Sequence, residues 1–261
     1  MGIIDKYSST QAAKLLENMG LGSLFSYAKP IELIRYLCER STKKDDIVLD
    51  FFSGSSTTAH AVMQLNAEDG GNRKFIMVQL PEETDKKSEA YKAGYKNICE
   101  IGKERIRRAG KKIKEENKDK DGIDKLDIGF RVLKTDTTNM KKVYYKPSDY
   151  SKNLLEQLED NIKNDRTPED LLFQVMLDLG VLLSSKIEQM EICGKKVFNV
   201  NNNYLIACFD KNISDEVVTE IAKRKPYYAV LRDNSISTDS VAINFEQIFK
   251  TYSPTTKRKV L

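Results

Sequence analysis

The sequence predicts an α/β protein built from two successive units. Three observations carry this prediction. An apolar strand at residues 47–52 breaks at a turn of small residues around Gly54, and a helical segment follows at once. A second apolar strand at residues 74–80 completes a strand–helix–strand order, which gives two parallel strands joined by a right-handed crossover. Strands and helices alternate again in the C-terminal half, which extends the prediction to a second, smaller α/β unit.

The strand at residues 47–52 is an unbroken apolar run and is therefore expected to be buried. Gly54 can adopt the backbone conformations that a sharp strand-to-helix turn demands. The helix at residues 56–65 begins with unpaired N–H groups and a positive dipole end, which commonly hold an anionic group. Small side chains would let a ligand approach this main chain: Ser53, Ser55 and Ser56.

The second strand, at residues 74–80, is also expected to be buried. In open α/β sheets a ligand lies at the carboxyl ends of the strands. The end of this strand is where an acidic residue usually holds ribose hydroxyls, and Gln79 or Glu82 is the candidate. A solvated turn carboxylate is an equally good interpretation of Glu82.

Composition and length limit the possible classes. With 261 residues, the chain forms one large domain or two smaller ones. A net charge of +4 permits a nucleic-acid partner without arguing for one. No apolar run approaches the ~20 residues that cross a bilayer, and the N-terminus lacks a signal-peptide pattern. A cytoplasmic protein with no membrane partner is therefore expected. Scattered cysteines and a single histidine, His60, argue against a metal site or a disulfide framework.

The turn lacks the patterns of two common phosphate-binding loops. There is no Gly-x-x-x-x-Gly-Lys-Ser/Thr sequence, and the third glycine of a dinucleotide fingerprint is missing. Residues 50–58, Asp-Phe-Phe-Ser-Gly-Ser-Ser-Thr-Thr, resemble the Asp-Phe-Phe-Ala-Gly-Ser-Gly-Thr-Thr box with which the amino-methyltransferases of DNA bind S-adenosylmethionine. The position of the family's second glycine is occupied by a serine. The resemblance implies cofactor contacts from Asp50, Phe52, Gly54, Ser55, Ser56 and Thr57.

A second motif lies upstream of the turn. Pro30 stands where a helix can begin, and apolar residues recur after it at helical spacing. An amphipathic helix packed on the sheet explains this pattern alone. However, Lys-Pro-x-x-Leu-Ile at residues 29–34 resembles the motif that closes over the methionine end of the cofactor in the same methyltransferases. The resemblance implies a cofactor role for Lys29 and Pro30.

Three further segments, at residues 72–82, 101–110 and 129–134, look like the modification subunit of type III restriction-modification systems. This resemblance covers most of residues 25–150, and the second half is similar only in its order of elements. It implies a Rossmann-like half-domain dependent on S-adenosylmethionine, followed by a smaller α/β (α+β) domain. It also implies adenine-N6 methylation of DNA, a homodimer in the full-length enzyme, and a partner restriction subunit that uses ATP.

The catalytic motif of these enzymes is absent from the sequence. The family uses Asp/Asn/Ser-Pro-Pro-Tyr/Phe, whose oxygens accept hydrogen bonds from the adenine amine while the ring stacks on the flipped-out base. The six prolines of this chain are all isolated. In one circular arrangement of the family, the catalytic motif and the target-recognition region precede the Lys-Pro motif. The chain is therefore expected to be the carboxyl-terminal part of a longer enzyme and inactive alone, with no catalytic residue of its own.

A charged linker at residues 117–124 sets the expected domain boundary. Residues 1–125 are expected to form the cofactor-binding part, and residues 126–261 an assembly or interaction domain. Before the linker, residues 9–18 are expected to form a helix, and residues 88–117 one long helix. The basic side of the long helix is a possible contact for DNA phosphates, although a solvated charged face is commoner.

The second half is expected to contain the following elements: strands at 127–136, 193–199, 203–210, 227–231 and 257–261, and helices at 151–164, 214–223 and 244–251. Thr167 and Pro168 predict a further helix start. The apolar run at residues 171–183 predicts either a central core helix or a face for self-association.

Three functions remain open from the sequence alone. The first is the cofactor-binding and assembly portion of a DNA adenine methyltransferase. The second is a non-catalytic assembly or DNA-contact module on a methyltransferase-like fold. The third is a different nucleotide- or cofactor-binding α/β protein, although the missing dinucleotide fingerprint counts against a nicotinamide enzyme. The order of the two cofactor motifs favours the first.

Overall fold

A computed structural model describes residues 6–25, 27–141, 162–232 and 239–261. Contacts within the chain divide it into two units, Met1–Leu133 and Lys134–Leu261, each with its own hydrophobic core. Most of the helix expected at residues 151–164 falls outside the described residues. Within the described ranges, no helix is both long enough and apolar enough to cross a membrane.

The first unit contains a parallel pair of strands, β1 (Ile47–Asp50) and β2 (Lys74–Met77). Leu49 lies opposite Ile76 in the register. The helix α3 (Thr57–Asp69) connects the two strands, so the expected strand–helix–strand order and the parallel pairing are confirmed. A complete Rossmann-like sheet contains more strands than β1 and β2, so the Rossmann-like arrangement stays a prediction.

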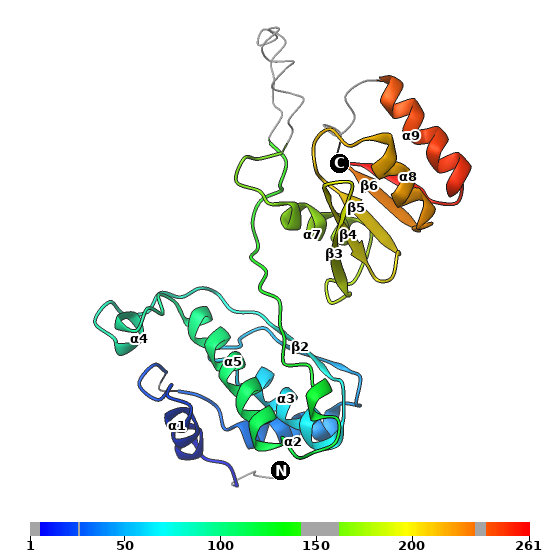
Figure 1. The fold of residues 1–261 in the computed structure, drawn as a ribbon. Helices are drawn as coiled ribbons and strands as arrows, with labels where there is room; N and C mark the ends of the chain where they lie inside the picture. Colours follow the sequence, from blue (N-terminus) through cyan, green and yellow to red (C-terminus); the bar gives the residue numbers. More distant parts are fainter. Residues whose placement is uncertain (1–5, 26, 142–161, 233–238) are drawn as a thin grey trace. The chain divides into compact units, whose positions relative to one another are not determined.

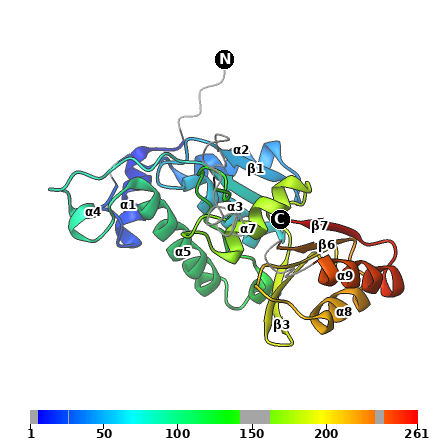
Figure 2. The same ribbon diagram turned by 90° about the horizontal axis from the view of Figure 1, so that it is seen from above.

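The helix α3 is the centre of the first unit (Figures 1 and 2). Its side chains are buried almost throughout the segment from Thr57 to Ala67. Three elements pack against α3: α2 (Ile31–Ser41), α5 (Ile98–Glu116) and the pair of strands. The helix α1 (Ser9–Asn18) adds to the same apolar core and has the bounds that the sequence predicts.

The two strands of the first unit are covered on one face only, so the prediction of buried strands is wrong. Val48 and Phe75 pack toward the helices. The alternate apolar residues of both strands, together with Val78 just after β2, are about half exposed, and we call them the open face: Ile47, Leu49, Ile76 and Val78. An unbroken apolar run is typical of a strand covered on both faces, and in the described residues nothing covers the second face.

The long helix expected at residues 88–117 is interrupted. The short helix α4 (Glu89–Lys92) ends before Gly94, whose φ of +94° is incompatible with a continuing helix. The helix α5 then begins anew after Asn97, whose side chain accepts a hydrogen bond from the Glu100 N–H at 3.1 Å.

The strand expected at residues 127–136 is also wrong. The chain there is irregular and has no partner strand in the described residues. Ile128 packs against Gly110 of α5, and the Phe130 ring lies 5.5 Å from the Arg107 guanidinium. Alternation of apolar residues therefore reflects packing against a helix. A short 3₁₀ helix, η1 (Ile123–Lys125), lies at the end of the expected linker.

The second unit contains a five-stranded mixed sheet in sequence order. The first three strands are antiparallel and the last three are parallel. The strands are β3 (Ile187–Ile192), β4 (Lys195–Val200), β5 (Leu205–Cys208), β6 (Tyr228–Leu231) and β7 (Lys257–Val260). The antiparallel strands β3–β5 thus continue into the parallel strands β5–β7, which corresponds to the expected mixed α/β character.

Helices cover both faces of this sheet (Figure 1). One face packs on α7 (Pro168–Asp178), and the other packs on α8 (Asp215–Lys223) and α9 (Asp239–Tyr252). Successive residues of β5 serve opposite faces, because Leu205 joins the α7 core and Ile206 joins the α8–α9 core. The start of α7 is the predicted one, with Thr167 forming a capping box.

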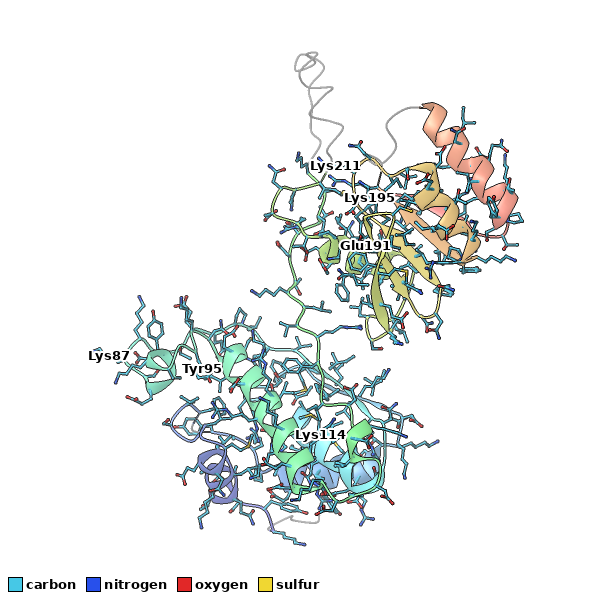
Figure 3. All side chains as sticks on the ribbon, in the orientation of Figure 1. Lys87, Tyr95, Lys114, Glu191, Lys195 and Lys211 are labelled. Atoms are coloured by element: carbon cyan, nitrogen blue, oxygen red, sulfur yellow. The ribbon has the colours of Figure 1, made fainter. Side chains whose placement is uncertain are left out.

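The strand β3 is absent from the sequence-based expectation. It pairs with β4 through a tight turn at Cys193 and Gly194, both of which have positive φ. Its residues are half-buried or exposed except for Ile192 and include Glu188 and Glu191, so they lack the apolar alternation that indicates a strand. At the start of β4, Lys195 Nζ donates a 2.9 Å hydrogen bond to the Lys211 carbonyl (Figure 3).

Candidate functional site

The turn from β1 to α3 lies at the carboxyl ends of both strands of the first unit. The Val78 N–H donates to the Asp50 carbonyl at 2.8 Å, and the Ser53 N–H donates to the Val78 carbonyl at 3.2 Å. These two bonds extend the pairing beyond the regular strands. The turn is therefore held against the end of β2, where ligands of α/β sheets lie.

Asp50 holds the turn through hydrogen bonds to its side-chain carboxylate. Its carboxylate accepts a 2.6 Å hydrogen bond from the Thr58 hydroxyl and a 3.1 Å bond from the Phe52 N–H. The two bonds join the end of β1 to the first turn of α3. In the structure, Asp50 therefore shapes the turn, and its carboxylate faces residues of its own chain.

Gly54 and Ser56 both adopt left-handed backbone conformations, with φ of +51° and +60°. A left-handed conformation costs a side-chain-bearing residue about 1–2 kcal/mol. Glycine adopts it without that cost. The related methyltransferase box has glycine at the position of Ser56, and the backbone geometry supplies the physical reason.

The two candidates at the end of β2 differ in their contact with the turn. The Gln79 amide oxygen accepts a 2.7 Å hydrogen bond from the Gly54 N–H, so this side chain belongs to the turn. The Glu82 side chain is exposed, and its backbone pairs with Leu80 and Ile98.

The side chains of Phe52, Lys29 and Pro30 take no part in the hydrogen bonds of this turn. Phe52 is 85% exposed, and its ring centroid lies 5.2 Å from that of Phe51. Pro30 is buried at the start of α2, whereas Lys29 is exposed. No hydrogen bond within the described residues joins Lys29 to the turn.

The side chains of Ser55 and Thr57 point toward α5. Arg105 of α5 donates from Nη1 to the Ser55 hydroxyl at 2.8 Å and to the Thr57 hydroxyl at 2.7 Å. All three residues are buried. Any ligand on the open side of the turn would therefore meet the backbone of Ser55 and Thr57 before it met their hydroxyls.

Sequence reasoning misses Arg105, although a signal is present. It stands four residues after Ile101 and four before Ala109, both of which are on the apolar side of α5. Residues at this spacing share one face of a helix. A charged residue inside an apolar stripe therefore marks a buried charge.

Burial lowers the pKa of two groups behind the turn. It lowers the pKa of the Arg105 guanidinium to about 10, so this group stays cationic at neutral pH. Burial and then the Arg105 charge lower the pKa of His60 to about 3, so the imidazole stays neutral. Within the described residues, Nε and Nη2 of Arg105 and Nδ1 of His60 have no hydrogen-bond partner.

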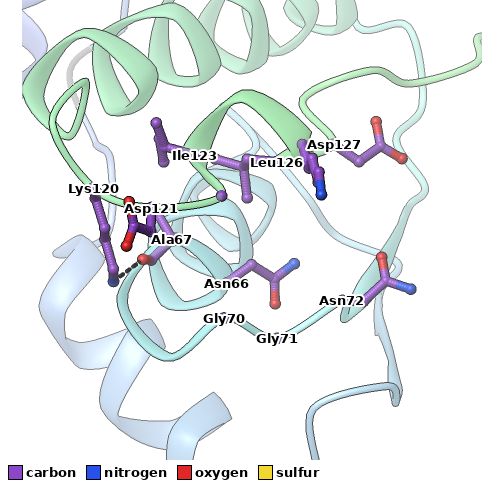
Figure 4. A pocket seen from close by; sticks show the side chains of 12 residues that line it. Asn66, Ala67, Gly70, Gly71, Asn72, Lys120, Asp121, Ile123, Leu126 and Asp127 are labelled. Atoms are coloured by element: carbon purple, nitrogen blue, oxygen red, sulfur yellow. Dashed lines mark hydrogen bonds between the residues drawn. The ribbon is translucent and has the colours of Figure 1, made fainter.

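A separate hollow of about 290 Å³ lies at the other end of α3, beside Asn66, Gly70 and Asp127 (Figure 4). There, Lys120 Nζ donates to the carbonyls of Ala67 and Glu68. A lysine that satisfies the last carbonyls of a helix serves as a cap. We therefore place the candidate site at the Gly54 turn. No cluster of three potential metal-binding side chains is found among the described residues.

Comparison with known proteins gives the family. A family model described as DNA methylase matches residues 4–88. The EcoPI Mod subunit of Escherichia phage P1, a type III restriction-modification enzyme, is 36% identical over 203 residues, which are 77% of this chain and 30% of that protein. The chain belongs to the family of type III modification methyltransferases.

Two further type III Mod subunits extend this comparison. The EcoP15I Mod subunit of Escherichia coli is 35% identical over 187 residues, or 70% of this chain and 26% of that protein. The StyLTI Mod subunit of Salmonella typhimurium is 40% identical over 124 residues, or 48% of this chain and 18% of that protein. The chain thus spans less than a third of each type III relative.

The sequence similarity to type III Mod subunits extends further along the chain than expected. An alignment of 203 residues does not fit within residues 25–150, so it extends into the second unit. The DNA methylase match at residues 4–88 includes every predicted cofactor residue, from Lys29 to Glu82. Arg105 lies beyond that match.

Proposed function

We propose that this chain is the cofactor-binding portion of a DNA adenine-N6 methyltransferase of a type III restriction-modification system. The observation that carries the proposal is the Gly54 turn, held at the carboxyl ends of β1 and β2 in a chain of this family. S-adenosylmethionine is the proposed cofactor. DNA and a type III restriction subunit are the proposed partners, with a homodimer in the full-length enzyme.

The residues of the turn are compatible with this cofactor. The start of α3 offers N–H groups that lack intrahelical partners, beside the left-handed Gly54. The exposed Phe52 ring offers a flat apolar surface for a purine. We assign Gln79 or Glu82 to the ribose hydroxyls, and Lys29 and Pro30 to the methionine end. When bound, S-adenosylmethionine supplies the methyl group.

The open face of β1 and β2 supports a larger domain around this portion. A two-stranded parallel sheet with one exposed apolar face is far from the doubly covered arrangement of parallel sheets. We propose that the remaining strands of a Rossmann-like sheet pack there, and that residues 126–261 form an assembly domain. In this proposal, catalysis requires groups that residues 1–261 do not supply.

The choice of cofactor is tested by calorimetry on the 261-residue chain. We expect S-adenosylmethionine to bind and NAD to give no heat of binding, because the turn lacks the third glycine of the dinucleotide fingerprint. Binding is expected to be weak, since in this proposal the pocket is completed by groups that residues 1–261 do not supply. Tight binding of NAD would overturn the assignment.

The lack of catalysis is tested with labelled methyl groups. The adenine amine has a lone pair delocalised into the ring, and this sequence has no Pro-Pro motif to bind and polarise the flipped-out base. We therefore expect no incorporation of label into duplex DNA by the purified chain. Incorporation above that of a heat-inactivated sample would contradict this expectation.

The absence of that motif also favours one alternative, a non-catalytic assembly or DNA-contact module. The basic side of α5 gives it little support. Arg107 pairs with Glu104 at 3.6 Å, and Lys114 Nζ donates to the Asp124 carbonyl at 3.1 Å (Figure 3). DNA binding in a gel shift, without any binding of S-adenosylmethionine, would favour this alternative.

A further inference from the structure

We infer that Arg105 is a positioning residue for the Gly54 turn, which serves ligand binding and not stability. Its guanidinium holds Ser55 and Thr57, the two residues on either side of the left-handed Ser56. The inference rests on the proposed function only for the identity of the ligand. The order of the turn belongs to this chain and is measurable without a ligand.

The geometry lets α5 act as a clamp on the turn. A Cβ at Gly102 would lie 2.6 Å from the Ser56 hydroxyl oxygen, so α5 packs closely against the turn and a larger residue would require that hydroxyl to move. Arg105 follows three residues later, on the same side of the helix. One of its nitrogens bridges two hydroxyls that are two residues apart at the start of α3. This contact constrains the backbone between those hydroxyls.

The same contact is a poor source of stability. Arg105 is 1% exposed, and within the described residues its guanidinium forms no ion pair with a carboxylate. Its Nε and Nη2 have no hydrogen-bond partner in the same ranges. Removing a cation from water costs more than two neutral acceptors return. Replacing Arg105 by an apolar side chain of similar length would therefore remove a buried charge and should not lower stability.

The cation also changes the potential at the turn. The start of α3 carries the positive end of the helix dipole. Arg105 adds a full positive charge behind it, and His60 stays neutral. An anionic group on the open side of the turn would be stabilised by both. The carboxylate of S-adenosylmethionine is such a group.

Hydrogen exchange on the 261-residue chain tests the positioning role without a ligand. In Arg105→Met, we expect the amides of residues 53–60 to exchange at least tenfold faster than in wild type. We expect the amides of α1 to exchange at the wild-type rate. The melting temperature should be no lower than that of wild type. Arg107→Met, which removes an exposed cation of the same helix, should leave residues 53–60 unchanged. Wild-type exchange at the turn in Arg105→Met would overturn the inference, as would a uniform rise throughout the first unit with a lower melting temperature.

A second set of variants keeps the test decisive if Arg105→Met fails to fold. Ser55→Ala with Thr57→Val removes both acceptors and leaves the cation buried without them, so the melting temperature should fall. Adding Arg105→Met to this pair should restore it, because the buried charge is gone. The turn should still exchange rapidly in the triple variant. A triple variant that melts no higher than the double, or whose turn is as protected as in wild type, would overturn the inference.

Titration with S-adenosylmethionine separates this inference from the proposed function. We expect Arg105→Met to bind at least tenfold more weakly than wild type, and Arg107→Met to bind as wild type does. If wild type shows no binding, the proposed cofactor is wrong for this chain, and the exchange experiments still decide the role of Arg105. If Arg105→Met binds as tightly as wild type, Arg105 does not position the turn for this ligand.

Discussion

His60 shows how burial controls a single residue. It is the only histidine of the chain and lies on α3 with 3% of its surface exposed. Burial, reinforced by the Arg105 charge, lowers its pKa from 6.5 to about 3. A metal or catalytic role for a lone histidine requires an accessible nitrogen. The imidazole of His60 is instead a neutral part of the packing behind the Gly54 turn.

The lowered pKa of His60 predicts a pH-dependent stability. Between about pH 3 and 6.5 the unfolded histidine binds a proton that the folded one does not, so stability is retained above pH 6.5 and falls as pH decreases. The expected slope is about 1.4 kcal/mol per pH unit. Urea unfolding of the first unit, followed by circular dichroism between about pH 5 and 6.5, measures this slope. Most carboxyl groups titrate below that pH range and so contribute little to it. The slope should be absent in His60→Gln, and an equal slope in that variant would contradict the account.

The limits of sequence reasoning at the residue scale are visible at two positions of the turn. The motif marks Ser56 as a departure from the glycine of the family, but only the fold shows that its φ is +60°. Gln79 is one of two candidates in the sequence, and the hydrogen bond to Gly54 connects it to the turn. Such pairings join residues distant in sequence, and a single sequence contains no signal for them.

At the scale of elements, local signals predict helices well and strands less well. The starts of α1 and α7 are encoded by caps within a few residues, Ser8 and Thr167. By contrast, the exposure of β1 and β2 depends on what packs over the sheet. The irregular segment at residues 127–136 shows the same limit, since alternation predicts a strand only where a partner strand is present.

The apolar run at residues 171–183 gives the clearest element-scale prediction. Val175 is fully buried in the core between α7 and the sheet, whereas Leu177 is 65% exposed. Val175→Glu should therefore bury an unpaired charge, lower stability by more than about 4 kcal/mol and unfold the second unit. Leu177→Glu should change stability by less than about 0.5 kcal/mol.

Circular dichroism and sedimentation separate the outcomes for these two variants. A folded Val175→Glu protein would contradict the core assignment. A Leu177→Glu protein that stays folded but loses mass relative to wild type would instead support an assembly face on α7. The core packing of Val175 and Met176 is the reason to expect a core helix.

At the scale of the whole molecule, the chain combines two α/β units that differ in how completely helices cover their sheets. The second unit has helices on both faces of its sheet, and the first leaves the open face of β1 and β2 exposed. The order of the motifs in the first unit is enough to predict the family, because two motifs at the right spacing are more specific than either alone. The similarity to the EcoPI Mod subunit extends into the second unit, where no motif indicates it.

The central claim is that the backbone at Gly54 forms the cofactor cradle, and two matched glycines at opposite ends of α3 test it. Gly54 and Gly70 have φ of +51° and +67°, and a Cβ at either would have no neighbour closer than 3.8 Å. Valine in this conformation is strained at both sites, so Gly54→Val and Gly70→Val should lose similar stability, at least about 1–2 kcal/mol each.

Calorimetry with S-adenosylmethionine on wild type and these two variants is the most direct measurement. We predict binding by wild type and by Gly70→Val, and no binding by Gly54→Val, because its side chain would occupy the space where the ligand approaches the turn. Binding by Gly54→Val as tight as that of wild type, or equal losses in both variants, would contradict the claim.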